Sequence, residues 1–146
     1  MFLLRPKSDP DCYGIDMAKL GDFIAFQAAI ALHKEAGSYD QVTSSVLREC
    51  MAMETLPKSE QRNCVKAIYS PFTAEQIAGK IAQLVTPSGT QAEVEVIYQT
   101  IEGLHDACPN HTGDWYFTGN YPTPGGHRVV NRAFFNYMEG RNERAY

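Results

Sequence analysis

An apolar stretch of ten residues, from Phe23 to Leu32, constrains the fold of this chain more than any other feature. It includes one polar residue, Gln27, and is about half as long as a helix that spans a bilayer. Its apolar side chains would cover more than one face of a helix, which is typical of a helix buried on most sides. We therefore predict a core helix that begins at Met17 and ends at Gly37, and a chain that does not span a membrane.

Helical patterns also occupy most of the remaining chain, and Gly and Pro mark their ends. The predicted helices cover residues 39–55, 59–69, 73–85, 91–107 and 128–139. The third of these has the clearest start, because Thr73 and Gln76 fit a capping box. Together with a short extended or strand segment near residues 115–118, these patterns predict a mainly α single domain of about five to six helices.

Charge and composition exclude one class of partner. The 146-residue chain has the size and the hydrophobic content, 44%, of one globular domain. Its formal net charge is −4, and no stretch concentrates Lys and Arg. Binding to the phosphates of a nucleic acid needs a basic surface, so we expect no nucleic-acid partner.

The cysteines indicate the compartment. Cys12, Cys50, Cys64 and Cys108 are widely scattered and form no Cys-x-x-Cys pair. After Met1, the N-terminus has only three apolar residues before Arg5, fewer than a secretory signal needs. Both observations favour reduced thiols in a cytoplasmic protein.

The most metal-like group is His105, Cys108 and His111, because residues three apart share one face of a helix. Pro109 interrupts that helix, however, and no second pair of ligands marks a zinc site. A half-exposed histidine and a buried thiol are the simpler interpretation, so we expect no metal and no cofactor. The chain also lacks the Gly-x-Ser-x-Gly motif of a serine nucleophile, and we assign no catalytic residue.

The segment before the last predicted helix is a candidate for anion binding. Gly125 and Gly126 would expose backbone N–H groups at the positive end of a helix dipole. Arg128, which follows His127, adds a bidentate donor that suits a phosphate or a carboxylate. The alternative is a rigid, proline-fixed turn that leads into the helix through glycine.

Aromatic side chains are dense just upstream, with four of them between residues 115 and 121. Trp115 and Tyr121 could form a platform for the ring of a ligand. The alternative is an aromatic staple that closes the domain or an interface with another domain.

Two motifs resemble a known enzyme family. The run Asp-Cys-Tyr-Gly-Ile-Asp-Met at residues 11–17, followed by a helical segment with Phe-Ile-Ala at residues 23–25, is similar to the stretch just past the phosphoribosyltransferase core of amidophosphoribosyltransferase. The run Gly-Asp-Trp-Tyr-Phe-Thr-Gly-Asn-Tyr-Pro-Thr-Pro-Gly-Gly at residues 113–126 resembles the C-terminal extension of a longer variety of that family. By this resemblance, residues 1–16 are a lead-in similar to the end of the core, and residues 17–146 are a helical C-terminal module.

The family makes 5-phosphoribosylamine from phosphoribosyl pyrophosphate and glutamine, the first committed step of purine synthesis. Its members use an N-terminal cysteine to hydrolyse glutamine and an acidic motif with adjacent aspartates to bind the pyrophosphate. Here Phe2 follows Met1, and no two aspartates are adjacent. The resemblance therefore implies a piece of the enzyme without either active site, and we expect Met1 to be an internal start or the chain to be a fragment.

Two functional hypotheses follow. The resemblance implies a structural or regulatory module that packs on the remainder of the transferase chain or forms a homo-oligomer. The alternative is a stand-alone nucleotide- or phosphate-binding module, in which a purine nucleotide is bound by Gly125, Gly126, His127, Arg128, Trp115 and Tyr121.

Overall fold

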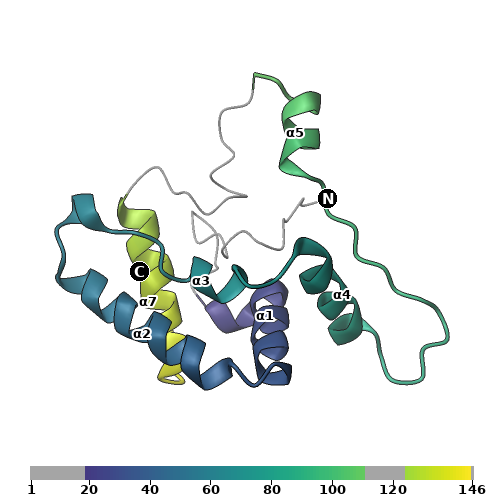
Figure 1. The fold of residues 1–146 in the computed structure, drawn as a ribbon, viewed down its shortest axis with the longest axis horizontal. Helices are drawn as coiled ribbons and strands as arrows, with labels where there is room; N and C mark the ends of the chain where they lie inside the picture. The colour runs from purple at the N-terminus through teal and green to yellow at the C-terminus, as the bar shows by residue number, and fades with distance from the viewer. Residues whose placement is uncertain (1–18, 111–123, 146) are drawn as a thin grey trace.

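The apolar stretch forms most of α1 (Ile24–Glu35), which packs against α4, η1, α2 and α3 in the computed structural model, whereas α5 stands apart from it (Figure 1). The structure describes residues 19–110 and 124–145. Within these ranges the chain forms six α-helices and two short 3-10 helices, and it has no strand. The prediction of a mainly α single domain is confirmed, while the extended segment predicted at residues 115–118 lies outside the described residues.

The remaining elements follow the order of the chain. They are η1 (Leu20–Asp22), α2 (Tyr39–Thr55), η2 (Lys58–Glu60), α3 (Lys66–Tyr69), α4 (Ala74–Val85), α5 (Ile101–Ala107) and α7 (Pro124–Met138). The most extensive packing is between α1 and α4 and between α2 and α7 (Figure 1). Because α3 contacts both α1 and α2, it joins these two pairs of helices.

Most of the surface of α1 is covered, as the sequence predicts. Its exposed polar residue, Gln27, donates a hydrogen bond of 2.7 Å to the carbonyl oxygen of Gly21. The buried residues of the helix are Phe26, Ala28, Ala29, Ile30 and His33. In the part of the chain that the structure describes, none of the helices has both the length and the hydropathy needed to cross a bilayer.

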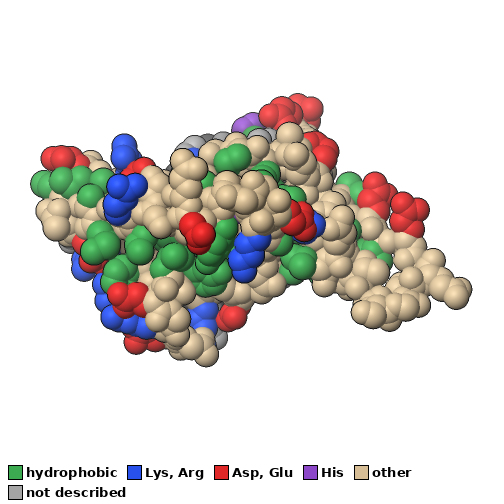
Figure 2. All heavy atoms as spheres, turned by 60° about the horizontal axis from the view of Figure 1, so that its bottom comes forward, with side chains coloured by type: hydrophobic (Ala, Val, Ile, Leu, Met, Phe, Trp, Pro, Cys, Tyr) green, Lys and Arg blue, Asp and Glu red, His purple; other side chains and the backbone are tan. Residues whose placement is uncertain are grey.

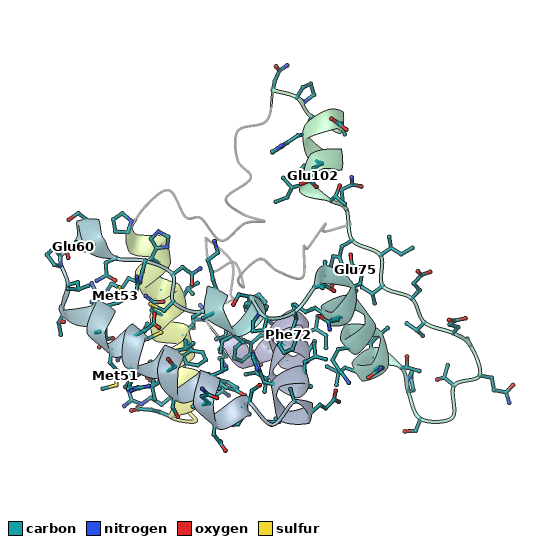
Figure 3. All side chains as sticks on the ribbon, in the orientation of Figure 1. Met51, Met53, Glu60, Phe72, Glu75 and Glu102 are labelled. Carbon is teal, nitrogen blue, oxygen red and sulfur yellow. The ribbon has the colours of Figure 1, made fainter. Side chains whose placement is uncertain are left out.

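A buried histidine ties α1 to α3. His33 is 1% exposed, and its Nε2 lies 2.8 Å from the carbonyl oxygen of Ile68. Its Nδ1 lies 2.9 Å from the hydroxyl of Ser38, so both ring nitrogens have partners. The ring also meets Phe72 edge-on, in the group of side chains between α1 and α4 (Figure 3). A polar group this deeply buried is tolerated because its hydrogen bonds are satisfied.

Aromatic rings join α1 to α7. Phe26 meets Tyr137 edge-to-face, with ring centroids 4.8 Å apart, and it meets Phe134 in the same way at 6.2 Å. The backbone of η1 approaches this cluster closely at Gly21, where an added Cβ would lie 3.3 Å from the ring of Tyr137. A larger residue there would push η1 away from α7.

Two predicted helices have the expected bounds. The predicted helix at residues 39–55 is α2. The capping box of α4 is also present: the Thr73 hydroxyl accepts from the Gln76 N–H at 3.2 Å, and the Gln76 side chain accepts from the Thr73 N–H at 2.8 Å. For both helices, residues close together in the sequence are sufficient to predict where the helix begins and ends.

The two outermost predicted helices have different starts. The first begins at Ile24 rather than Met17, because Phe23 is extended and residues 20–22 form a separate 3-10 turn. The last begins at Pro124 rather than Arg128, since proline is favourable as the first residue of a helix.

The helix predicted at residues 59–69 is interrupted. Only Lys66–Tyr69 is α-helical, and Lys58–Glu60 is a 3-10 turn. The side chain of Asn63 accepts a hydrogen bond of 3.1 Å from the N–H of Val65. Asparagine competes in this way with the helical hydrogen bonds of its own neighbourhood, which explains the break.

The helix predicted at residues 91–107 is wrong over its first half. The α5 helix begins only after Thr100, whose hydroxyl accepts from the N–H of Gly103 at 2.9 Å. Val94 and Ile97, which the pattern placed on a buried face, are 36% and 81% exposed. The first half of the predicted helix contains Val94, Val96 and Ile97, and β-branched residues favour extended backbone. The helical spacing of apolar residues between 91 and 100 was therefore not sufficient to predict a helix there.

Substitution of two glycines by alanine tests the fold, because the structure predicts that one substitution destabilises the protein and the other stabilises it. Gly37 has a φ of +68° and ends α1, with the Ser38 N–H bonded to the His33 carbonyl as in a Schellman motif. Gly79 lies within α4, and an added Cβ would meet nothing within 4 Å at either position. We expect Gly37→Ala to lower the free energy of unfolding by about 1 kcal/mol, and Gly79→Ala to raise it by roughly 0.5–1 kcal/mol. Urea denaturation followed by circular dichroism measures both changes, and a stabilising Gly37→Ala would contradict the assigned helix end.

Candidate functional site

The residues predicted to bind an anion lie at the start of α7, but they do not share one side of it. Both glycines are within the first turn of the helix rather than ahead of it. Gly126 is buried, whereas Gly125 and Arg128 line a hollow on the surface. His127 is not part of that lining. The structure thus brings two of the four residues together.

The hollow lies between α7 and the end of α2 and has a volume of about 630 Å³. Arg128 and Arg132 are one helical turn apart on α7, so they share one face of the helix, and both line the hollow. Its lining consists of Glu54, Gly125, Arg128, Val129, Arg132 and Ala145. Sequence analysis identified two of these residues and missed the contributions from Glu54 and Arg132.

The positive charge of the two arginines in the hollow is partly compensated by Glu54. Arg132 donates to Glu54 at 2.8 Å, and its guanidinium also lies 5.2 Å from the ring centroid of Phe135. Arg128 is exposed to solvent. With one carboxylate and two guanidinium groups, the hollow has a net charge near +1. It can bind a carboxylate or a phosphate through Arg128, although Glu54 would repel a second negative charge.

The histidine of the motif contributes no positive charge. His127 is half-buried, and burial lowers its pKa because it disfavours the imidazolium form. The positive charge of Lys66 lowers this pKa further. The imidazole is therefore neutral near pH 7, and it does not strengthen an anion site.

The other predicted site residues are not placed by the structure. Trp115 and Tyr121, proposed as an aromatic platform, lie outside the described residues, as does His111. The other two members of the metal-like group, His105 and Cys108, are both exposed at α5. The expectation of a buried thiol at Cys108 was wrong, because α5 buries none of its residues. In the described ranges, no three His, Cys, Asp or Glu side chains are grouped so that they could hold a metal ion.

One structural cluster was not predicted. Asn131 on α7 is 3% exposed and clamps the segment that precedes α3. Its Oδ1 accepts from the Cys64 N–H at 3.0 Å, and its Nδ2 donates to the Arg62 carbonyl at 2.8 Å. A signal was present in the sequence, because Asn131 is three residues before Phe134 and shares the apolar face of the last predicted helix. The partner segment, 67 residues away, gave no such signal.

Comparison of the sequence with protein-family models, with curated proteins and with solved structures found no match. The geometry of the described residues therefore supplies the structural argument for function.

The pKa of His127 has a consequence for stability. Since the folded state lowers this pKa, the unfolded chain binds the proton more readily at pH values below the ordinary value of 6.5. We expect the free energy of unfolding to fall as the pH decreases through 6.5, and His127→Gln to reduce that fall. Urea denaturation between pH 5 and 8 measures it. The same slope in the wild type and in His127→Gln would contradict the prediction.

Proposed function

We propose that this chain is the helical C-terminal module of an amidophosphoribosyltransferase, with a structural or regulatory role rather than a catalytic one. The observation that carries the proposal is a set of exposed large apolar side chains at the end of α4 and in the loop after it, called here the 84–97 surface: Leu84, Val85, Val94 and Ile97. Leu84 and Val85 are 46% and 49% exposed, and Ile97 is 81% exposed.

The 84–97 surface spans the last two residues of α4 and the loop that follows it. After α4 the chain runs outward in a long loop before it reaches α5 (Figure 1). Figure 3 shows Glu102 on α5, well away from the labelled side chains of α2. Several large apolar side chains that stay exposed within one short segment favour contact of that segment with another protein.

The partner that we propose is the phosphoribosyltransferase core. In the family that the sequence resembles, the motif at residues 11–17 follows that core directly, and in this chain α1 begins seven residues after the motif. A module joined to the core at this point would lie beside it. In Figure 2, Lys and Arg lie among Asp and Glu over the helical body, whereas Asp and Glu alone are seen at the right-hand end of the molecule. The segment that carries the 84–97 surface has no Lys or Arg, so a partner with basic side chains around an apolar contact would complement it.

Binding to a shortened enzyme tests this proposal. We expect the 146-residue chain to bind an amidophosphoribosyltransferase from which the segment after the Tyr-Gly-Ile-Asp-Met motif has been removed. Ile97→Ser should raise the dissociation constant by about tenfold or more, because burial of an Ile side chain at the contact contributes about 1.5–3 kcal/mol to binding. Isothermal titration calorimetry measures the affinity.

The matched control is Gln91→Ser, at an exposed polar position of the same loop, which should leave the affinity unchanged. Absence of binding, or equal effects of the two substitutions, would contradict the proposal. A melting temperature that rises with protein concentration would instead assign the 84–97 surface to a second copy of the chain. An independent check is the DNA upstream of the Met1 codon, where we expect the reading frame to stay open into a phosphoribosyl-pyrophosphate motif.

A second candidate function is binding of a nucleotide or phosphate in the hollow at α7. The observation that favours it is the position of Arg128, an exposed guanidinium beside Gly125 in a hollow large enough for a nucleotide. Calorimetry with AMP, GMP and phosphoribosyl pyrophosphate tests it. We expect weak binding that Arg128→Ala abolishes and Arg48→Ala, an exposed arginine of α2, leaves unchanged. No heat at millimolar ligand would remove this candidate.

A further inference from the structure

Two cysteines that are far from any predicted site lie side by side in the core. Cys50 is on the last third of α2, and Cys64 lies two residues before α3. They are 2% and 4% exposed, both are free thiols, and their side chains are hydrogen-bonded to each other. Two thiols that interact directly can be joined by a disulfide where their Cα atoms lie about 4.4–6.8 Å apart.

The backbone on both sides of this pair is held in place. Cys50 is within a helix that packs along α7. The N–H of Cys64 donates to Asn131, which is on α7 as well. Both cysteines are therefore positioned by the same helix, and their separation does not depend on a loose loop.

We propose that Cys50 and Cys64 are a site of reversible oxidation, which a peroxide converts into an intramolecular disulfide. The thiolate of Cys64 attacks one oxygen of hydrogen peroxide, the O–O bond breaks, and Cys64 becomes a sulfenic acid while hydroxide leaves. The sulfur of Cys50 then attacks the sulfenic sulfur and displaces the second oxygen. The protons of both thiols end on the two oxygens, so that two thiols and one peroxide give one disulfide and two water molecules.

The environments of the two sulfur atoms assign these roles. The hydrogen bond from Cys50 lowers the pKa of Cys64, and Arg62 lowers it further against the opposing effect of burial. The same hydrogen bond, together with burial, raises the pKa of Cys50. Cys64 is thus the better thiolate, and Cys50 is the thiol that resolves the sulfenic acid.

Access also favours Cys64 as the first thiol to react. Its Sγ lies 3.7 Å from the carbonyl oxygen of Arg62, a residue whose side chain is 69% exposed. Cys50 is on a helix in the core and is 2% exposed, against 4% for Cys64. Peroxide is small enough to enter such a site, whereas a bulky disulfide reagent is not.

The test uses the full chain with Cys12→Ser and Cys108→Ser, so that only the pair can react. With stoichiometric hydrogen peroxide, we expect the intact mass to fall by two hydrogen atoms and both thiols to become unreactive towards alkylation after denaturation. Dithiothreitol should restore both. The disulfide closes a ring of 15 residues, so the melting temperature should rise by roughly 10 °C.

Two variants separate the roles, and far-ultraviolet circular dichroism first checks that each is folded. In Cys50→Ser, a dimedone label should appear on Cys64; in Cys64→Ser, Cys50 should stay unlabelled at the same peroxide concentration. Two free thiols after treatment of the parent chain, or a disulfide between two chains, would overturn the proposal. A label on Cys50 but not on Cys64 would overturn the assignment of roles.

Discussion

The enclosure of α1 is the constraint on which the rest of the structure depends. A helix with few polar side chains cannot leave a face in water, so α4, α3 and η1 each cover part of it, and α7 reaches it through the ring contacts of Phe26. Burial of each large apolar side chain contributes about 1.5–3 kcal/mol, and this favours the enclosed arrangement over any in which α1 is open. The positions of the other helices follow from this requirement.

Buried polar groups make this arrangement specific. Apolar contacts tolerate small shifts of one helix against another, whereas His33 and Asn131 each require a particular backbone group at hydrogen-bond distance. His33 fixes α3 relative to α1, and Asn131 fixes the segment before α3 relative to α7. The contact between Cys50 and Cys64 depends on the second of these restraints, which links the packing of the core to the chemistry of the thiols.

The chain therefore has two parts with different properties. The helical body around α1 buries its apolar side chains and holds a pair of thiols in contact. In the segment after α4, Val96 and Tyr98 still pack against the core, but Ile97 is exposed and α5 buries none of its residues. Such a combination of an ordered core and exposed apolar side chains is consistent with the proposed role as part of a larger assembly. In the hollow beside Arg128, Glu54 compensates part of the positive charge of the two arginines, which leaves about one positive charge to attract a small anion.

The sequence by itself determined the features that depend on a few neighbouring residues. The capping box of Thr73 and the bounds of α2 were predicted because capping and the spacing of apolar residues act within one or two helical turns. Only the tertiary structure decided that Ile97 is exposed and that Gly125 and Arg128 meet Glu54 in a hollow without His127. The physical reason is that a side chain is buried, paired or exposed according to which distant element packs against it, and periodicity along the chain contains no information about that partner.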